Sequence, residues 1–143
     1  MFSAREGTPV EVDATFEVMA TVTGTQVAER FLDALEALDF EAAAELFAED
    51  GRLRALVPQN VRDEEGPDAI ANHFRFWWDD LDDLQLVERH AERLHDSTAI
   101  RYRFRGRDRE DGWVEQEQAG YLRVDGGKIV AMNVVCSGFI PVS

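Results

Sequence analysis

The stretch RFLDALEALDFEAAAELFAEDG, residues 30–51, decides the fold that the sequence predicts. Apolar side chains recur every three or four positions from just before this stretch through its first half: Val27, Phe31, Leu35 and Leu38. This period is typical of an amphipathic helix, which we expect over residues 25–38 with Thr25 as its N-cap. Asp39 is well suited to cap a second, alanine-rich helix over residues 40–47, which the acidic residues and glycine that follow would end. The stretch therefore predicts two helices joined by a very short link.

The segments that follow predict a strand, a loop and a third helix. Residues 52–57 alternate charged and apolar side chains up to Pro58, which favours a strand. Residues 59–66 are polar and are expected to form a mobile loop. Pro67 suits the first turn of a helix, and residues 67–81 carry a broad apolar face. That face consists of Ile70, Phe74, Trp77, Trp78 and Leu81.

The rest of the chain predicts antiparallel sheet. Four runs with strand-like patterning are separated by turn-forming sequences: residues 84–94, 97–107, 112–124 and 128–140. In the second and third of these runs, opposite charges can face each other if Arg103 and Arg105 lie across from glutamates. The same register would bring Tyr102 and Phe104 to the face that carries Gln116 and Gln118. Near the start, residues 10–22 alternate with period two and predict a further strand, although a helix fits some of the same positions.

These elements give an α+β fold class, in which a curved antiparallel sheet wraps around three helices from the N-terminal half. Residues 30–51, GPDAIANHF at 66–74 and YLRVDGGKIVAM at 121–132 resemble the nuclear-transport-factor-two-like superfamily, which includes SnoaL-like cyclases and ketosteroid isomerases. The resemblance covers most of residues 25–140 and implies a cystatin-like cone with a central cavity. We therefore divide the chain into an extension, residues 1–24, and a single domain, residues 25–143.

Despite the family resemblance, this sequence lacks the catalytic residues of the family's best-understood enzymes at the matching positions. Ketosteroid isomerases use a base aspartate, a tyrosine and a protonated aspartic acid. In an ungapped match, Phe31 takes the place of the tyrosine, Ala55 that of the base, and Gly120 lies near that of the acid. The inward positions also lack the carboxylate pair of the related epoxide hydrolases. Asp39 stands where dehydratase-like relatives often place an acid, but its spacing favours an N-cap.

Composition excludes several classes of partner. The 143 residues carry 29 acidic and 15 basic side chains, a net charge of −14, so polyanionic nucleic acid and anionic membrane surfaces are expected to repel the protein. The single cysteine, Cys136, cannot form an intramolecular disulfide, and its surroundings in sequence favour a small buried side chain. We expect a cytoplasmic protein with no metal and no cofactor.

The candidate site residues are those expected to face the cavity. They are Phe31, His73, Trp77, Tyr102, Gln116, Gln118 and Met132. His73 is the one candidate catalytic residue, because a neutral imidazole can act as a base near pH 7. Gln116 and Gln118 either satisfy a structural network with Tyr102 or bind a polar group of a ligand.

Two functions remain open from the sequence. The first is a small-ligand-binding protein with a mostly apolar cavity, which could act as an isomerase, dehydratase or cyclase by proton transfer next to a carbonyl group. The second is a non-catalytic interaction domain whose cavity its own side chains fill. A homodimer is expected in either case, because Val135 lies on the outward side of a strand whose alternate residues face inward.

Overall fold

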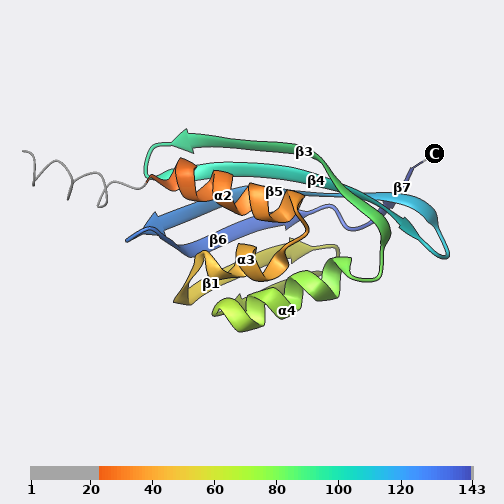
Figure 1. Ribbon diagram of the computed structural model, residues 1–143, viewed down its shortest axis with the longest axis horizontal. Helices are drawn as coiled ribbons and strands as arrows, with labels where there is room; N and C mark the ends of the chain where they lie inside the picture. The colour runs from red at the N-terminus through yellow and green to blue at the C-terminus, as the bar shows by residue number, and fades with distance from the viewer. Residues whose placement is uncertain (1–22, 143) are drawn as a thin grey trace, which may run out of the picture.

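Three helices cover one face of a curved sheet, as the α+β prediction requires (Figure 1). The computed structural model describes residues 23–142, so the strand predicted for residues 10–22 lies outside the described residues. Within these residues the helices are α2 (Gly24–Glu36), α3 (Phe40–Glu45) and α4 (Pro67–Trp78). None of the described helices is both long and apolar enough to cross a membrane.

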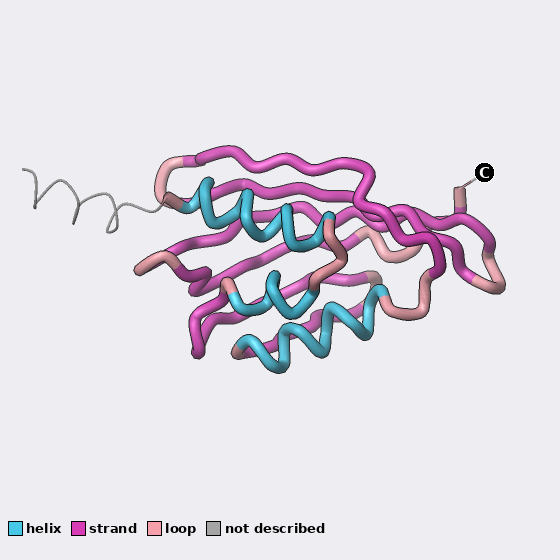
Figure 2. The backbone as a smooth tube through the Cα atoms, in the orientation of Figure 1, coloured by secondary structure: helices cyan, strands magenta, loops and turns pink. Residues whose placement is uncertain are grey.

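Seven strands form the sheet behind these helices (Figure 2). They are β1 (Phe47–Val57), β2 (Asn60–Glu65), β3 (Asp82–Leu94), β4 (Ser97–Asp108), β5 (Gly112–Asp125), β6 (Lys128–Cys136) and β7 (Ile140–Pro141). The order across the sheet is β2-β1-β6-β5-β4-β3, with β7 paired to β5. Neighbours run antiparallel except β1 and β6, which are parallel. The sheet is therefore mixed rather than purely antiparallel.

The first two helices begin at side-chain caps. Thr23, not Thr25, caps α2: its hydroxyl accepts from the Gln26 amide at 3.0 Å while the Gln26 side chain accepts from the Thr23 amide at 2.9 Å. This reciprocal pair satisfies two amides at once, so the N-cap lies two residues before the predicted one and the helix begins at Gly24 rather than at residue 25. Asp39 caps α3 as predicted, accepting from the Ala42 amide at 3.0 Å.

The polar segment 59–66, predicted to be a mobile loop, is instead mostly the strand β2. Val57 pairs with Asn60 across a tight turn in which Gln59 has a φ of 65°, and the antiparallel pairing continues to Arg52 and Glu65. β2 lies at the edge of the sheet and its side chains are largely exposed. An edge strand needs no alternating apolar residues, so the residues of β2 themselves carry no strand pattern.

Several other boundaries differ from the prediction. The second helix ends at Glu45, with Leu46 as its C-cap, rather than at residue 47, and β1 begins at Phe47 rather than at residue 52. The third helix ends at Trp78 rather than at residue 81, because Asp79 forms its C-cap and the Leu81 amide turns back to the Trp78 carbonyl at 3.2 Å. The last long strand ends at Cys136 rather than at residue 140. Gly138 has a φ of 75°, which interrupts the strand before the short β7.

The β4–β5 hairpin has the predicted register. Tyr102 lies opposite Gln118, and Phe104 lies opposite Gln116, on the inner face. On the outer face Arg103 pairs with Glu117 across the strands and also lies 3.2 Å from a carboxylate oxygen of Glu115. The matched charges and the matched interior residues therefore select the same pairing.

Phe31 of α2 stands at the centre of the core. Its ring is fully buried and packs edge-on against three other rings, with centroids 6.2 Å away for Phe47, 5.9 Å for Phe74 and 6.0 Å for Tyr102. These three rings belong to β1, α4 and β4, so this one side chain joins both layers.

Arg89 of β3 fixes the outer side of α2 to the sheet edge. Its guanidinium lies within 2.9 Å of carboxylate oxygens of Glu29, Asp33 and Glu36, which follow one face of the helix. Partial burial lowers the pKa of Arg89, but bonds to these three carboxylates outweigh it and raise the pKa above its ordinary value. The helix is therefore held by its apolar face and by its charged face.

Phe31→Ala tests the central place of this ring. Removing a fully buried phenyl leaves a cavity, and we expect the free energy of unfolding to fall by about 3–5 kcal/mol. Phe76→Ala is the matched control, because Phe76 of α4 is 66% exposed; we expect it to cost less than about 1 kcal/mol. Urea unfolding measures both, and equal losses would contradict the assignment of Phe31 to the core.

Candidate functional site

The seven predicted site residues all lie between the helices and the inner face of the sheet. Phe31 comes from α2, His73 and Trp77 from α4, Tyr102 from β4, Gln116 and Gln118 from β5, and Met132 from β6. All seven are buried. Residues far apart in sequence thus converge on one interior region because α2 and α4 pack on the same face of the sheet (Figure 1).

Aromatic contacts connect most of these residues. The ring centroids of His73 and Trp77 are 4.2 Å apart. Those of Trp77 and Phe74 are 6.2 Å apart in a stacked arrangement, and those of Phe74 and Phe31 are 5.9 Å apart. Phe31 contacts Tyr102 in turn. A continuous row of rings therefore runs from α4 to the middle of the sheet.

The two glutamines are bonded to aromatic side chains. Tyr102 donates its hydroxyl proton to the side-chain oxygen of Gln118, and the indole nitrogen of Trp78 donates to the side-chain oxygen of Gln116 at 2.6 Å. The amide nitrogen of Gln118 has no hydrogen-bond partner among the described residues. Gln118 is fully buried, so its amide nitrogen is a buried donor that no described group satisfies.

His73 has one ring nitrogen toward a carboxylate and the other without a partner. Nδ1 lies 3.4 Å from a carboxylate oxygen of Glu64 on β2, and the His73 side chain is only 7% exposed. Nε2 is buried and has no hydrogen-bond partner among residues 23–142. A proton on Nδ1, facing the carboxylate, leaves Nε2 with a free lone pair.

Burial sets the protonation of this group. Desolvation lowers the pKa of His73 below 6.5, the nearby Glu64 carboxylate raises it in part, and the Arg62 guanidinium lowers it again. The net effect is a lowered pKa, so His73 is neutral at pH 7. Burial raises the pKa of Tyr102 well above 10, and the neighbouring Cys136 adds to the rise, so its hydroxyl keeps its proton.

The arrangement combines a neutral imidazole with neutral hydrogen-bond donors in apolar surroundings. Such a set can accept a proton at one atom and stabilise developing negative charge at another. Within the described range, no three side chains of His, Cys, Asp and Glu gather closely enough to hold a metal ion. The imidazole and the hydrogen-bond donors can support proton transfer and hydrogen bonding.

Glu64 is the neighbour that sequence reasoning missed. It lies in the segment interpreted as a loop, and its place beside His73 depends on the pairing of Glu64 with Leu53 across the β1–β2 hairpin. The tight turn after Pro58 was the only available signal for that hairpin. With six residues and no apolar alternation, β2 could not reveal which face Glu64 occupies.

The chain matches the model of the SnoaL-like domain over residues 28–132. No curated protein matches it. Among solved structures, it is similar to a nuclear transport factor 2-like protein from Burkholderia thailandensis, with 22% identity, a TM-score of 0.68, and coverage of 80% of this chain and 91% of that chain.

Two further structures share the fold at lower identity. A hypothetical protein with a ketosteroid isomerase-like fold from Catenulispora acidiphila, in complex with trimethylamine, is 17% identical with a TM-score of 0.60 over 78% of this chain and 85% of that one. A phenazine biosynthesis-related protein from Pseudomonas aeruginosa is 15% identical with a TM-score of 0.59 over 85% of each chain. These similarities establish the architecture.

The lowered pKa of His73 predicts a specific loss of stability in mild acid. As the pH is lowered through 6.5, the unfolded chain takes up a proton at this residue before the folded chain does. Because the unfolded state then binds more protons, the free energy of unfolding decreases as the pH decreases. Urea unfolding between about pH 7 and pH 5.5 should show a shallower fall for His73→Gln than for the wild type. His95→Gln, at an exposed side chain, is the control and should keep the wild-type slope; an unchanged slope in His73→Gln would contradict the prediction.

Proposed function

Because this chain belongs to the family of SnoaL-like domains, we propose that it binds a small, mostly apolar molecule with a carbonyl group between its helices and its sheet. The ligand-facing residues in this proposal are Phe31, His73, Trp77, Tyr102, Gln116, Gln118 and Met132. We further propose that the protein acts in the cytoplasm, in keeping with its single, buried thiol at Cys136.

The single observation that carries the proposal is the pair of buried nitrogens without partners, Nε2 of His73 and Nε2 of Gln118. A buried polar atom that finds no hydrogen bond costs about 1–3 kcal/mol. A ligand or ordered water with polar atoms would remove this cost. A carbonyl oxygen suits the Gln118 donor, and a polarised C–H or O–H suits the free lone pair of His73.

The reaction we propose is proton transfer next to the carbonyl, as in an isomerisation, dehydration or cyclisation. His73 removes the proton at Nε2, and its ring becomes an imidazolium whose Nδ1 faces Glu64. Hydrogen-bond donors such as the Gln118 amide stabilise the oxygen on which negative charge develops. The proton then returns from Nε2 to another carbon of the substrate or to a leaving oxygen, which restores the neutral imidazole.

The descriptions of two structural neighbours support a small organic ligand. One of them was solved in complex with trimethylamine, and another is described as related to phenazine biosynthesis. Both descriptions concern small organic molecules.

A thermal-shift screen with small carbonyl compounds tests the proposed binding. A ligand present at 100 times its dissociation constant should stabilise the protein by about 2.7 kcal/mol. Gln118→Leu should lose that stabilisation, whereas Gln85→Leu, at an exposed position of β3, should keep it. For any compound that is turned over, His73→Gln should abolish the reaction with the fold intact.

Two outcomes contradict the proposal. If no compound in a broad carbonyl library stabilises the protein, the proposed ligand site is wrong. If a folded His73→Gln variant keeps full turnover, His73 has no part in the mechanism. Circular dichroism of each variant separates loss of function from loss of fold.

A second candidate function, a dimeric interaction domain, has its own observation. The interior is densely packed with rings, while the outer face of the sheet exposes an apolar group across β2, β1, β6 and β5. This group consists of Val61, Leu56, Val135 and Tyr121, which border a shallow pocket of about 440 Å³. We propose that a second copy of the chain packs on this face to form a homodimer, burying side chains that are otherwise exposed to water.

Sedimentation measures the proposed dimer directly. At micromolar concentration we expect a mass of about twice 16.2 kDa. Val135→Glu places a charge on the outer face at a side chain that is 58% exposed, and should give the monomer. Phe76→Glu, on the helix layer, should remain dimeric. A wild-type mass near that of one chain would contradict the proposal.

A further inference from the structure

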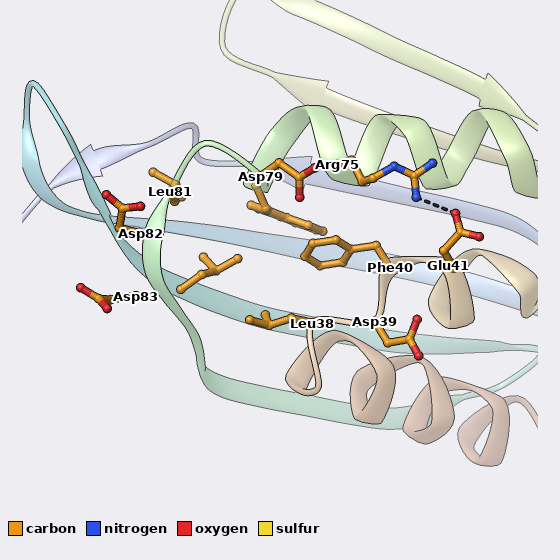
Figure 3. Close-up of a pocket in the computed structure, with 11 residues that line it drawn as sticks. Leu38, Asp39, Phe40, Glu41, Arg75, Asp79, Leu81, Asp82 and Asp83 are labelled. Atoms are coloured by element: carbon orange, nitrogen blue, oxygen red, sulfur yellow. Dashed lines mark hydrogen bonds and ion pairs between the residues drawn. The ribbon is translucent and has the colours of Figure 1, made fainter.

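A pocket of about 620 Å³ opens where the helix layer meets the start of the third strand (Figure 3). Three segments form it: the link and first turn of α3 at residues 38–41, the end of α4 at residues 75–79, and residues 81–84 leading into β3. None of the seven residues proposed above for the interior lines it. The pocket is therefore a separate feature of the molecule.

The inner wall of this pocket is aromatic and aliphatic. Trp78 and Phe40 both line it, and their rings are 5.2 Å apart with an interplanar angle of 39°. Leu38, Leu81 and Leu84 complete the apolar lining, and Figure 3 shows the Phe40 ring directed into the space between the segments. Both aromatic side chains are buried, which fixes the orientation of their rings.

Carboxylates dominate the polar part of the lining. Five of them stand beside one guanidinium, that of Arg75: Asp39, Glu41, Asp79, Asp82 and Asp83. Arg75 is already engaged, because it donates to Glu41 and to Asn72 at 2.6 Å each. A carboxylate oxygen of Asp83 forms an ion pair with the Arg107 guanidinium at 2.6 Å, whereas Asp79 and Asp82 make no ion pair within residues 23–142. The pocket thus keeps a negative excess.

The end of α4 adds to this excess. Asp79 is the C-cap of a helix of 12 residues, so the negative end of the helix dipole lies at the pocket. Carbonyl groups at a helix C-terminus favour positive charge nearby. This contribution is independent of the side-chain carboxylates.

We propose that this pocket binds a compact organic cation, an ammonium group that carries alkyl substituents. The alkyl groups would contact the Phe40 and leucine side chains that line the pocket, and the positive charge would lie within reach of Asp79 and Asp82. A hydrated metal ion would not use the apolar wall, and an anion would be repelled by the carboxylates. The inference stands apart from the function proposed for His73.

Choline and its uncharged isostere 3,3-dimethylbutan-1-ol test the proposal, because they differ only in the charged nitrogen. We expect choline to bind at least tenfold more tightly, with amide shift changes in a ¹H–¹⁵N spectrum confined to residues 38–41 and 75–84 and a shift of the Trp78 indole signal. Equal affinity for the two compounds, or shift changes elsewhere in the molecule, would overturn the proposal.

Substitutions separate the charge from the aromatic wall. Asp79→Asn combined with Asp82→Asn should weaken choline binding at least fivefold, while the control Asp111→Asn, in the turn before β5, should leave it unchanged. Phe40→Leu keeps an apolar side chain but removes the ring, and should also weaken binding, with thermal unfolding used to verify the fold. Unaltered affinity in the double variant would overturn the proposal.

Discussion

Polar groups trapped between the helices and the sheet must find hydrogen bonds inside the protein, and this requirement shapes the whole interior. The side-chain oxygens of Gln116 and Gln118 meet it by accepting from the indole of Trp78 and the hydroxyl of Tyr102, so both aromatic side chains are held in one orientation. The amide nitrogen of Gln118 is left without such a bond among the described residues. Phe31 packs against the Tyr102 ring and positions α2. The placement of the helices thus depends on amides that an all-apolar core would not need.

Much of the interior could be predicted because its signals are local. The alternation along β4 and β5 identified which side chains face inward, and the facing charges of Arg103 and Glu117 selected the register. Asp39 as an N-cap also follows from its immediate neighbours. In these cases a residue's partners lie on the same element or across one tight turn, where spacing alone determines geometry.

The rest depends on contacts that no local pattern encodes. The parallel pairing of β1 with β6 joins segments about 80 residues apart, and its register shifts between Phe47 and Arg52. The contact between His73 and Glu64 likewise arises only once β2 has paired with β1 and α4 has packed beside it. The seven site residues could be proposed from their inward direction, but the carboxylate beside His73 and the pocket near Trp78 required the assembled layers.

The polar character of β2 has an effect on the behaviour of the protein among its own copies. A strand at a sheet border exposes unpaired backbone groups that can recruit another chain and begin aggregation. Four of the six residues of β2 are charged, and the opposite border, β3, begins with two aspartates. Desolvating such side chains is costly, so the borders resist uncontrolled growth of the sheet from one molecule to the next.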